Sequence, residues 1–495
     1  MRVNTLRIEF DYFRVYRVRQ NLFAESDIGV VYMQILITIA LIIIGVLLFE
    51  FIIFAHEFGH FITAKRSGVQ VNEFALGMGP KLFSFVRGET RYSLRLFPVG
   101  GYCSMEGEDQ DSENPRAFVN AKVWKRMIII VAGAVMNFIV GLLFVFILTL
   151  FTPQFGTTTV QEFSANAASV NSGLQQGDRI VSVDGYSTLN TKDLQFAIQT
   201  LNYKNVDPDS LSVYKEDCST ELSKLYASLV TDNKLSDDLS EKLYNNTLLP
   251  YTSKISKVQD KNSAYELVKE GTDALYKAAD VKKPKDFKYP TIKDREECIR
   301  YTGNVKVIRD GKETELKDVQ FLTYYKDENA KKEKKYSVAM DFYVTEKEKN
   351  FGTIMEETFT GTLTMGRSVW KSLIMLVQGR FGFNELSGPV GITKAVQTVA
   401  ADGLDNGGFG IAVFNILSIM ALITINLGII NLLPFPALDG GRFVFLLIEA
   451  IFRKPVPRKV EYIVNGVGLA LLLAFIAVIS VKDIIQLITG TFPTM

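Results

Sequence analysis

Both histidines of this 495-residue chain lie within five residues, in the sequence His56-Glu57-Phe58-Gly59-His60. Histidines at positions i and i+4 share one face of an α-helix, so their imidazoles can reach a single zinc ion. Glu57 lies beside that face, where its carboxylate can accept a proton from a zinc-bound water. The spacing therefore predicts a hydrolytic metal site, and the alternative is a helix end with two surface histidines.

The motif follows a stretch of hydrophobic residues that is long enough to cross a membrane. Four stretches reach the roughly 20 apolar residues that a spanning helix needs, at about 31–55, 127–151, 409–433 and 461–488. No signal-peptidase cleavage pattern follows the first stretch, which predicts a retained span. Ionisable groups are costly at membrane depth and usually mark functional sites there, so this position favours the metal site.

The composition narrows the functional classes. The chain is 47% hydrophobic with a formal net charge of +1, which does not suggest nucleic-acid binding. Its three cysteines, Cys103, Cys218 and Cys298, are too few for a disulfide framework or a cysteine zinc cluster. Cys218 and Cys298 either form one disulfide in an oxidising compartment or stay as two free thiols.

The distribution of Lys and Arg in the loops predicts the orientation of the spans. Ten basic residues lie between the first two spans, at 56–126, and five lie between the last two, at 434–460. Because basic loops stay on the cytoplasmic side, residues 155–405 are expected outside. Residues 1–30 carry five arginines that this topology would also place outside. This N-terminal extension is therefore interpreted as doubtful or disordered, with Met33 as an ordinary first residue.

A catalytic zinc site needs three protein ligands and an open position for water. Since the chain has no third histidine, the remaining ligand must be a carboxylate, and Asp439 is the best candidate. It follows the third span, in a segment where prolines end the helix and Gly440-Gly441 permit a tight turn. The first and third spans both run from outside to inside, so Asp439 is expected at the same depth as His56 and His60. A plain helix exit is the alternative.

Two motifs in this arrangement resemble the site-2 protease family of intramembrane zinc proteases, over residues 33–495. They are HEFGH in the first span and Asn-x-x-Pro-x-Pro-x-Leu-Asp-Gly-Gly at 431–441. Two further matches are Gly133-x-x-x-Asn137 in the second span and Ser-Gly-Pro-Val-Gly-Ile at 387–392. The paired zinc motifs are highly specific in combination.

The resemblance implies a role for each candidate residue. It implies that Glu57 activates the water and that one zinc ion is bound by His56, His60 and Asp439. It also implies that Asn137 and Asn431 are polar residues beside the active site. For Asn137, a role in helix packing remains the alternative.

Residues 69–105 predict β-structure between the first two spans. Segments 70–76, 81–86 and 90–96 are short, partly alternating and separated by Gly, Pro or charged turns. The resemblance implies that this region is a membrane-associated β-hairpin near the metal. An exposed strand edge can pair with an unwound substrate, whose amides a transmembrane helix would hide. An ordinary surface hairpin is the alternative.

The pattern G-L-x-x-G-D-x-I-x-x-V-x-G, from Gly173 to Gly185, resembles a PDZ domain, which is expected at 155–350. Asp184-Gly185 predicts a hairpin turn, 191–201 a short helix, and 304–308 with 313–316 the closing strands. Residues from about 203 to 302 are interpreted as a mostly helical insertion. The resemblance implies that the domain excludes substrates with bulky outer portions, and a domain that only packs on the membrane part is the alternative.

Residues 353–405 connect the outer domain to the third span. An amphipathic pattern at 353–380 predicts an interfacial helix, and a soluble packing helix is the alternative. Glu50 lies seven residues before Glu57 on nearly the same helix face. It either lines a water path to the metal or pairs with a polar group.

These features predict a polytopic α-helical membrane protein with about four transmembrane helices, a membrane-associated β-hairpin and an extracytoplasmic PDZ-like α+β domain carrying a helical insertion. Its parts are expected at 31–152, 155–350, 353–405 and 406–495. By resemblance, it is a zinc metalloendopeptidase of the bacterial plasma membrane, with its active site near the cytoplasmic side. The substrates then expected are single-span membrane proteins trimmed by a site-1 protease, such as anti-sigma factors or remnant signal peptides.

Two other functions remain open. A different membrane metalloprotease would take a glutamate as its third ligand, and the Asp439 motif and the PDZ-like pattern argue against it. A catalytically inactive scaffold would bind membrane helices or peptide tails. The intact Glu57 argues against that scaffold.

Overall fold

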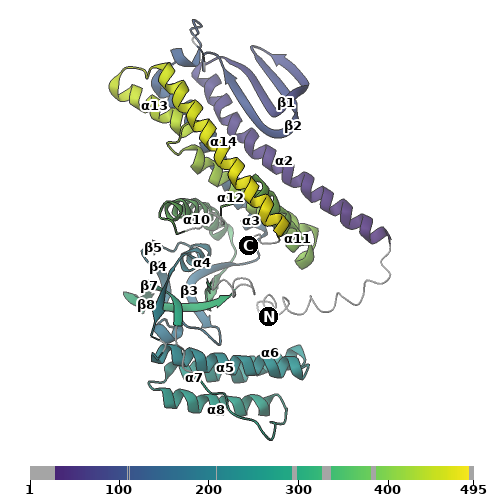
Figure 1. Ribbon diagram of the computed structural model, residues 1–495, viewed down its shortest axis with the longest axis vertical. Coiled ribbons are helices and arrows are strands. Elements are labelled where there is room, and N and C mark those ends of the chain that lie inside the picture. Colours follow the sequence, from purple (N-terminus) through teal and green to yellow (C-terminus); the bar gives the residue numbers. More distant parts are fainter. Residues whose placement is uncertain are drawn as a thin grey trace. The chain divides into compact units, whose positions relative to one another are not determined.

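The computed structural model describes residues 28–108, 110, 112–207, 209–292, 298–325, 336–380 and 386–489 (Figure 1). The doubtful N-terminal extension lies almost entirely outside these residues. Two compact units are present, one of Met1–Leu148 with Val369–Met495 and one of Thr149–Ser368. The first unit contains most of the apolar helical residues, and the second contains a larger β-sheet.

Within the described residues, four helices are long and apolar enough to cross a membrane, as predicted. They are α2 (Ile28–Ser67), α3 (Val123–Phe151), α12 (Phe409–Asn431) and α14 (Arg458–Thr489). Many of their large apolar side chains are exposed, as expected of surfaces that face lipid. Helix α2 continues beyond His60 to Ser67, so the histidine motif lies inside a helix and not at its end.

Three more helices belong to the second half of the chain. They are α10 (Phe351–Val377), α11 (Pro389–Gly407) and α13 (Asp439–Phe452). Helices α10 and α11 account for most of the connector expected at 353–405. Helix α13 departs from the loop expected between the last two spans. Its Phe443 and Leu446 pack in a core with Ala64 and Val69. This tertiary contact stabilises the helix, and it could not be read from the short sequence between the two spans.

Strands β1 (Val71–Arg87) and β2 (Thr90–Met105) form an antiparallel pair with several irregularities of register. Phe74 pairs with both Tyr92 and Cys103, so β2 bends back around the first half of β1. The segments therefore lie in the order 81–87, 90–95, 71–76 and 101–105. The three predicted segments are present, and 101–105 adds an edge segment that the sequence pattern did not indicate.

Large apolar side chains cover the half of this hairpin that contains its turn. The exposed ones are Met78, Leu82, Phe83, Phe85, Val86, Leu94, Leu96 and Phe97. A hairpin in water would expose few such side chains side by side. The surface is therefore suited to contact with lipid rather than water.

The second unit contains an eight-stranded sheet with the order β10-β3-β4-β7-β8-β9, in which β5 pairs with β4 and β6 pairs with β7. The strands are β3 (Phe155–Phe163), β4 (Arg179–Val183), β5 (Tyr186–Ser187), β6 (Asn202–Val206), β7 (Cys298–Arg309), β8 (Lys312–Tyr325), β9 (Tyr336–Ala339) and β10 (Phe342–Lys347). The expected closing strands lie within β7 and β8, which are longer than predicted.

The turn predicted at Asp184-Gly185 and the short helix predicted at 191–201 are both present in the structure. Asp184 and Gly185 both have positive φ, 46° and 74°, in the turn between β4 and β5. Helix α4 (Thr191–Gln199) begins after Asn190, whose side chain accepts the Asp193 N–H. Leu194 of this helix is fully buried in the core that covers the sheet.

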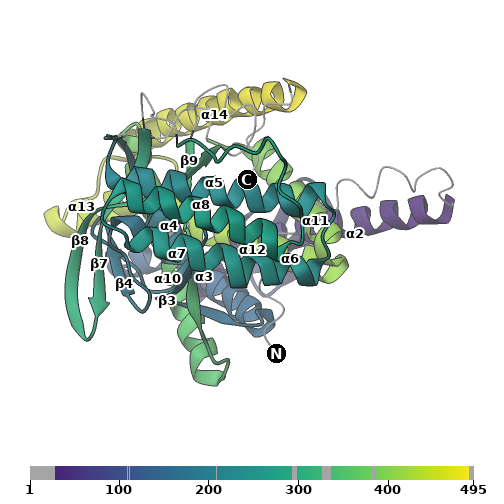
Figure 2. The same ribbon diagram turned by 90° about the horizontal axis from the view of Figure 1, so that it is seen from below.

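A helical insertion separates β6 from β7 and has its own hydrophobic core. It comprises α5 (Leu211–Asp232), α6 (Asp237–Leu243), η4 (Tyr244–Leu248), α7 (Leu249–Lys257) and α8 (Lys261–Ala278). Helices α5, α7 and α8 lie side by side (Figure 2). Strand β6 falls inside the interval predicted as the insertion, so the helices begin later than expected. Cys218 is a buried free cysteine in this core, and the side chain of Cys298 lies outside the described part of the chain.

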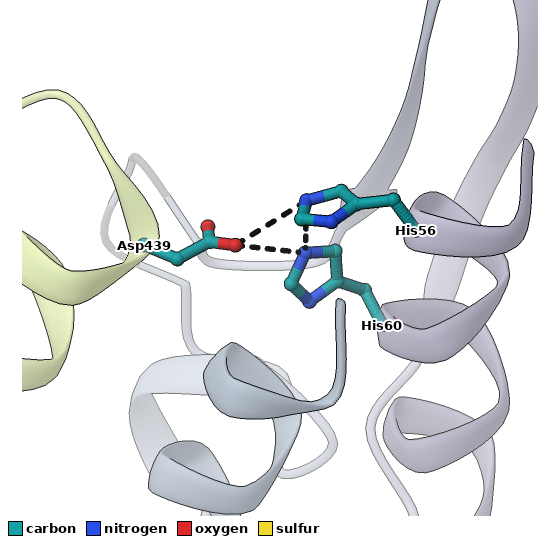
Figure 3. A group of neighbouring side chains, drawn as sticks. All are labelled: His56, His60 and Asp439. Atoms are coloured by element: carbon teal, nitrogen blue, oxygen red, sulfur yellow. Dashed lines mark hydrogen bonds and ion pairs between the residues drawn. The ribbon is translucent and has the colours of Figure 1, made fainter. Parts of the chain in front are cut away.

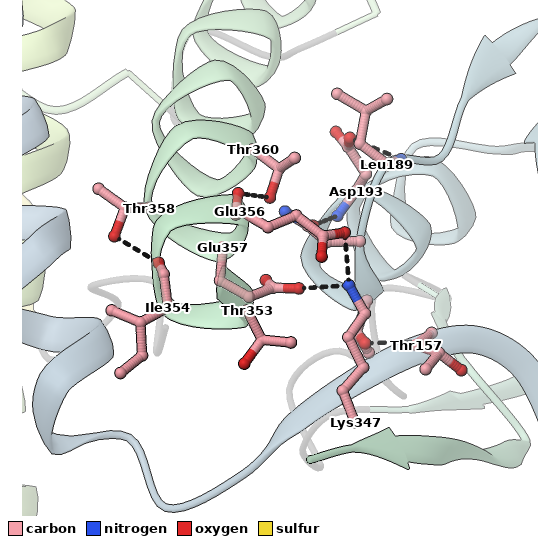
Figure 4. A network of polar contacts seen from close by, with 12 residues as sticks. Thr157, Leu189, Asp193, Lys347, Thr353, Ile354, Glu356, Glu357, Thr358 and Thr360 are labelled. Carbon is pink, nitrogen blue, oxygen red and sulfur yellow. Dashed lines mark hydrogen bonds and ion pairs between the residues drawn. The ribbon is translucent and has the colours of Figure 1, made fainter. Parts of the chain in front are cut away.

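Charged contacts fix the first part of α10 to the second unit (Figure 4). Lys347 Nζ lies 2.9 Å from the Oε1 atoms of both Glu356 and Glu357. Arg367 Nη1 lies 3.0 Å from Oδ2 of the buried Asp193 at the start of α4. This part of α10 therefore packs on protein through its polar side chains, while Phe359 and Leu363 remain exposed. Both the interfacial and the packing interpretation of this helix stay predictions.

A buried ion pair attaches the insertion to the sheet. Arg300 Nε and Nη2 lie 3.0 Å and 2.8 Å from the two carboxylate oxygens of Glu216, and both side chains are buried. Breaking a buried pair leaves an uncompensated charge, which costs about 3–5 kcal/mol. We therefore expect Glu216→Ala to increase hydrogen exchange throughout α5 and to lower the melting temperature.

The matched control is Lys224→Ala on the same helix, because the exposed pair between Lys224 and Glu221 is worth only about 0–1 kcal/mol. Equal exchange in the two variants would contradict the assignment of Glu216 as an attachment point.

Candidate metal centre

Three side chains from two helices converge in the first unit (Figure 3). His56 and His60 come from α2, and Asp439 is the first residue of α13. The two histidine Nε2 atoms are 3.3 Å apart, and each lies 3.3 Å from Asp439 Oδ2. The structure therefore brings together the three residues that the sequence predicts as metal ligands.

The triangle of donor atoms has the dimensions that zinc requires. In a tetrahedral site with bonds of about 2.0–2.1 Å, neighbouring ligand atoms lie about 3.3–3.4 Å apart. Two imidazole nitrogens and one carboxylate oxygen also match the ligand types of catalytic zinc sites. Three protein ligands leave the fourth tetrahedral position open, so the residues fit a zinc ion with room for water.

Hydrogen bonds on the far side of each imidazole orient the two rings. His60 Nδ1 lies 2.8 Å from the carbonyl oxygen of Ile129, to which only a protonated Nδ1 can donate. This tautomer leaves the lone pair of Nε2 facing Asp439. Such contacts behind a ligand hold its ring in place and make the nitrogen that faces the metal more basic.

Asn137 lies behind the other imidazole. Its Nδ2 is 3.2 Å from His56 Nδ1, while its Oδ1 is buried and has no hydrogen-bond partner within the described part of the chain. A half turn of the amide exchanges the two atoms and lets Oδ1 accept the Nδ1 proton of His56. That orientation pairs the orphaned oxygen and also leaves His56 Nε2 unprotonated toward Asp439. The structure thus places Asn137 directly against a candidate ligand.

Two glycines allow α3 to approach the histidines. A Cβ atom on Gly133 would lie 2.4 Å from His60 Nε2 and 2.7 Å from His56 Cε1. A Cβ atom on Gly59 would lie 2.4 Å from the carbonyl oxygen of Ala132. The sequence identified Gly133 only as a motif match, and the geometry shows that any side chain there would occupy the space of both imidazoles.

The segment before Asp439 folds tightly back on the start of α13. Ala437 has a positive φ of 74°, which is unusual for a residue with a side chain. Cβ atoms on Gly440 and Gly441 would lie 2.1 Å and 2.4 Å from the carbonyl oxygens of Leu433 and Phe435. The glycines are therefore required by close backbone approach, and Asp439 lies in the first turn of α13, where a carboxylate is favoured.

A cavity of about 370 Å³ opens in front of the three candidate ligands. It is lined by His56, Glu57, His60, Tyr102, Cys103, Ser104, Met105, Glu108, Ile130 and Asp439. Glu57 is thus beside the candidate ligands, as its sequence position predicted. Asn431 ends α12 and is not among the residues that line the cavity.

The cavity wall also contains residues that sequence reasoning missed. Tyr102 to Met105 belong to the edge segment of the β1–β2 sheet, and Gly101 lets this edge approach Glu57, whose Cγ would lie 3.4 Å from a Cβ there. Glu108 forms an ion pair with Arg442, the residue after the Asp-Gly-Gly sequence. In the sequence, the only indication of the Glu108–Arg442 pair was that a basic residue follows Asp-Gly-Gly.

A charged network holds the edge segment to the sheet. Arg95 Nη2 lies 3.0 Å from Glu73 Oε1 and also contacts the Tyr102 hydroxyl. Burial acts to raise the pKa of Glu73, but hydrogen bonds from Ser93 and Arg95 lower it to about 2. Glu73 therefore stays ionised at neutral pH and keeps its contact with Arg95.

A centre of two histidines and one aspartate with a neighbouring glutamate, beside helices apolar and long enough to span a membrane, is the arrangement of a membrane metalloprotease. Residues 44–475 match the family model described as Peptidase family M50. The chain belongs to this family, the site-2 proteases, and is a membrane protein, so the resemblance seen in the sequence motifs is confirmed.

Two bacterial relatives are similar over almost the whole chain. The zinc metalloprotease RasP of Bacillus licheniformis is 29% identical over 469 residues, which cover 90% of this chain and 99% of the relative. The regulator of sigma-W protease RasP of Bacillus subtilis is 28% identical over 467 residues, covering 90% and 98% respectively. These relatives indicate a metalloprotease that uses zinc.

Gly133→Ala tests the packing of the centre. Its methyl group would collide with both imidazoles, so we expect zinc affinity to fall about tenfold or more, together with activity. The control is Gly45→Ala on α2, where the nearest atom to an added Cβ would be an ordinary 3.7 Å away. Zinc titration of the purified protein against a fluorescent chelator measures the difference, and wild-type affinity in Gly133→Ala would contradict the packing.

Proposed function

We propose that this protein is an intramembrane zinc endopeptidase that hydrolyses peptide bonds within transmembrane segments. The main support for this proposal is the triangle of donor atoms from His56, His60 and Asp439. Glu57 lies in the same cavity, and the unit contains apolar helices long enough to span a membrane. His56, His60 and Asp439 are the ligands in this proposal. When bound, zinc supplies Lewis-acid chemistry and lowers the pKa of a bound water.

Glu57 is the catalytic acid–base group in this proposal. Its carboxylate takes the proton of the attacking water and later gives it to the leaving amine. The carbonyl of Ile129 and the amide of Asn137 keep the imidazoles of His60 and His56 in the tautomers that ligation needs. Asn431 is assigned a polar supporting role at the end of α12 by resemblance alone.

Substrate presentation is assigned to the edge segment 101–105. A peptide bond inside a transmembrane helix is hidden because its amides are already hydrogen-bonded. An unwound substrate can pair with a free strand edge, and this edge lines the same cavity as Glu57. The apolar tip of the β1–β2 hairpin would keep the sheet in contact with the membrane.

The second unit is assigned as an extracytoplasmic PDZ-like domain, with the membrane site near the cytoplasmic face of a bacterial plasma membrane. The pattern from Gly173 to Gly185, the turn at Asp184 and the following helix α4 support this assignment. Such a domain would exclude proteins whose outer portion had not been removed by a site-1 protease. Anti-sigma factors fit this role because one relative is named a regulator of sigma-W, and remnant signal peptides are the second candidate class.

The two alternatives are weaker. A metalloprotease with a glutamate as third ligand does not fit, because the described residues that converge on the histidines supply Asp439. An inactive scaffold would not need a carboxylate such as Glu57 beside a complete ligand triangle. The next experiment separates the scaffold from the enzyme.

Glu57→Gln should abolish turnover while leaving the ligand triangle intact. Loss of a general base lowers rates by about 10²–10⁴-fold, so an uncleaved single-span substrate should accumulate on co-expression. Zinc content should match the wild type, and Glu270→Gln on the exposed surface of α8 is the control. Unchanged cleavage by Glu57→Gln would contradict the enzymatic function.

Phe83→Asp tests whether the hairpin tip lies in the membrane. The Phe83 side chain is 62% exposed, and a charge at the bilayer centre costs about 2.5–3.5 kcal/mol. We expect slower cleavage of a transmembrane substrate with unchanged zinc affinity, whereas Phe83→Leu should behave as the wild type. Equal cleavage by the two variants would show that the tip does not need an apolar surrounding.

A further inference from the structure

Helix α14 contacts the rest of the first unit along a narrow stripe. Among its described residues, the buried positions are Gly468, Ile479, Asp483 and Gln486, and most other side chains are exposed. Asn465 is partly buried, and it precedes Asp483 by 18 positions. At 3.6 residues per turn, this separation is about five turns, so Asn465 and Asp483 lie on the same face.

One end of this stripe holds the segment that leads into Asp439. The Ala437 amide donates a hydrogen bond to Asn465 Oδ1, with the two atoms 3.3 Å apart. A Cβ atom on Gly468 would lie 2.4 Å from Pro436 Cβ and 2.8 Å from its carbonyl oxygen. Helix α14 therefore touches this loop with its backbone and binds it with one amide side chain, two residues before the candidate ligand.

The other end of the stripe is anchored on α11. Asp483 Oδ2 accepts hydrogen bonds from the amides of Gly388 and Gly391, at 2.9 Å and 2.8 Å. It thereby caps the N-terminus of α11, whose own N-cap residue Gly388 has no side chain. Because both ends of the stripe bind backbone groups, α14 cannot slide or rotate without losing them.

The loop needs this support because of its backbone conformation. Ala437 has φ 74°, a left-handed conformation that a residue with a Cβ atom rarely adopts. A strained conformation of this kind persists only where the surrounding structure enforces it. Within the loop, the Leu438 amide donates to the Phe435 carbonyl at 3.2 Å. From outside the loop, α14 adds the hydrogen bond of Asn465 to the Ala437 amide and the contact of Gly468 with Pro436.

We propose that Asn465 is a positioning residue for the metal centre, which acts through the backbone of Ala437 to present Asp439 to His56 and His60. The inference rests on the proposed ligand set. Asn465 does not touch substrate or metal in this proposal. A residue that merely packed α14 against the loop would need no hydrogen-bond acceptor, and this difference makes the proposal testable.

The test compares two replacements of similar size in the detergent-purified full chain. Asn465→Leu removes the acceptor, whereas Asn465→Asp keeps an oxygen at the same position. We expect zinc affinity, measured by competition with a fluorescent chelator, to fall about 10- to 100-fold in Asn465→Leu. Affinity should stay within about threefold of the wild type in Asn465→Asp, and in the control Leu469→Ala, whose side chain is 48% exposed on the same helix.

A second substitution separates positioning from general loss of structure. Glycine adopts the left-handed conformation without strain. In Ala437→Gly, residue 437 can therefore keep its positive φ without the hydrogen bond to Asn465. We expect it to restore at least half of the lost affinity, on a logarithmic scale, in the Asn465→Leu background. Wild-type affinity in Asn465→Leu, or no recovery on adding Ala437→Gly, would overturn the proposal.

Asp439→Ala distinguishes failure of this inference from failure of the proposed function. It should lose zinc more severely than Asn465→Leu. If Asp439→Ala kept wild-type affinity, the ligand set itself would be wrong. If Asp439→Ala lost zinc and Asn465→Leu did not, only the positioning role would fail.

Discussion

The close approach of α2 and α3 is the constraint on which the first unit depends. Two imidazoles must face one carboxylate at 3.3 Å, and Gly59 and Gly133 provide the space that this convergence needs. In a membrane, helices gain little from burying apolar surface against each other, so small residues that allow close packing have a large effect. The same approach brings the carbonyl of Ile129 and the amide of Asn137 within reach of the rings.

Two ion pairs between residues far apart in the sequence hold another part of this unit. Helix α13 carries Asp439 at its start and is held by two ion pairs, Arg442 with Glu108 and Glu449 with Arg126, the latter at 2.5 Å. Both pairs join α13 to segments near the histidines. Rotation of α13 would separate both pairs and leave partly buried charges unpaired, so the two pairs favour one orientation of the helix.

The sequence predicted the parts of the site that depend on local spacing. His56, Glu57 and His60 lie within one helical turn, and the four spans follow from hydrophobic length. Asp439 followed from ligand chemistry and loop charges. Helix α13, the edge segment 101–105 and the contact of Asn465 with Ala437 were not predictable, because each depends on contacts between distant parts of the chain. Gly133 was recognised as part of a motif. The reason for a glycine there is that a Cβ atom would lie 2.4 Å from His60 Nε2, and this proximity depends on the fold.

The two ends of the helical insertion are neighbours in the sheet, since Val206 of β6 pairs with Cys298 of β7. An element whose ends meet in this way, and which has its own core, can be lengthened, shortened or exchanged without breaking the strands that carry it. The insertion can therefore change in length or sequence without any change in the residues of the metal centre, which lie in the first unit.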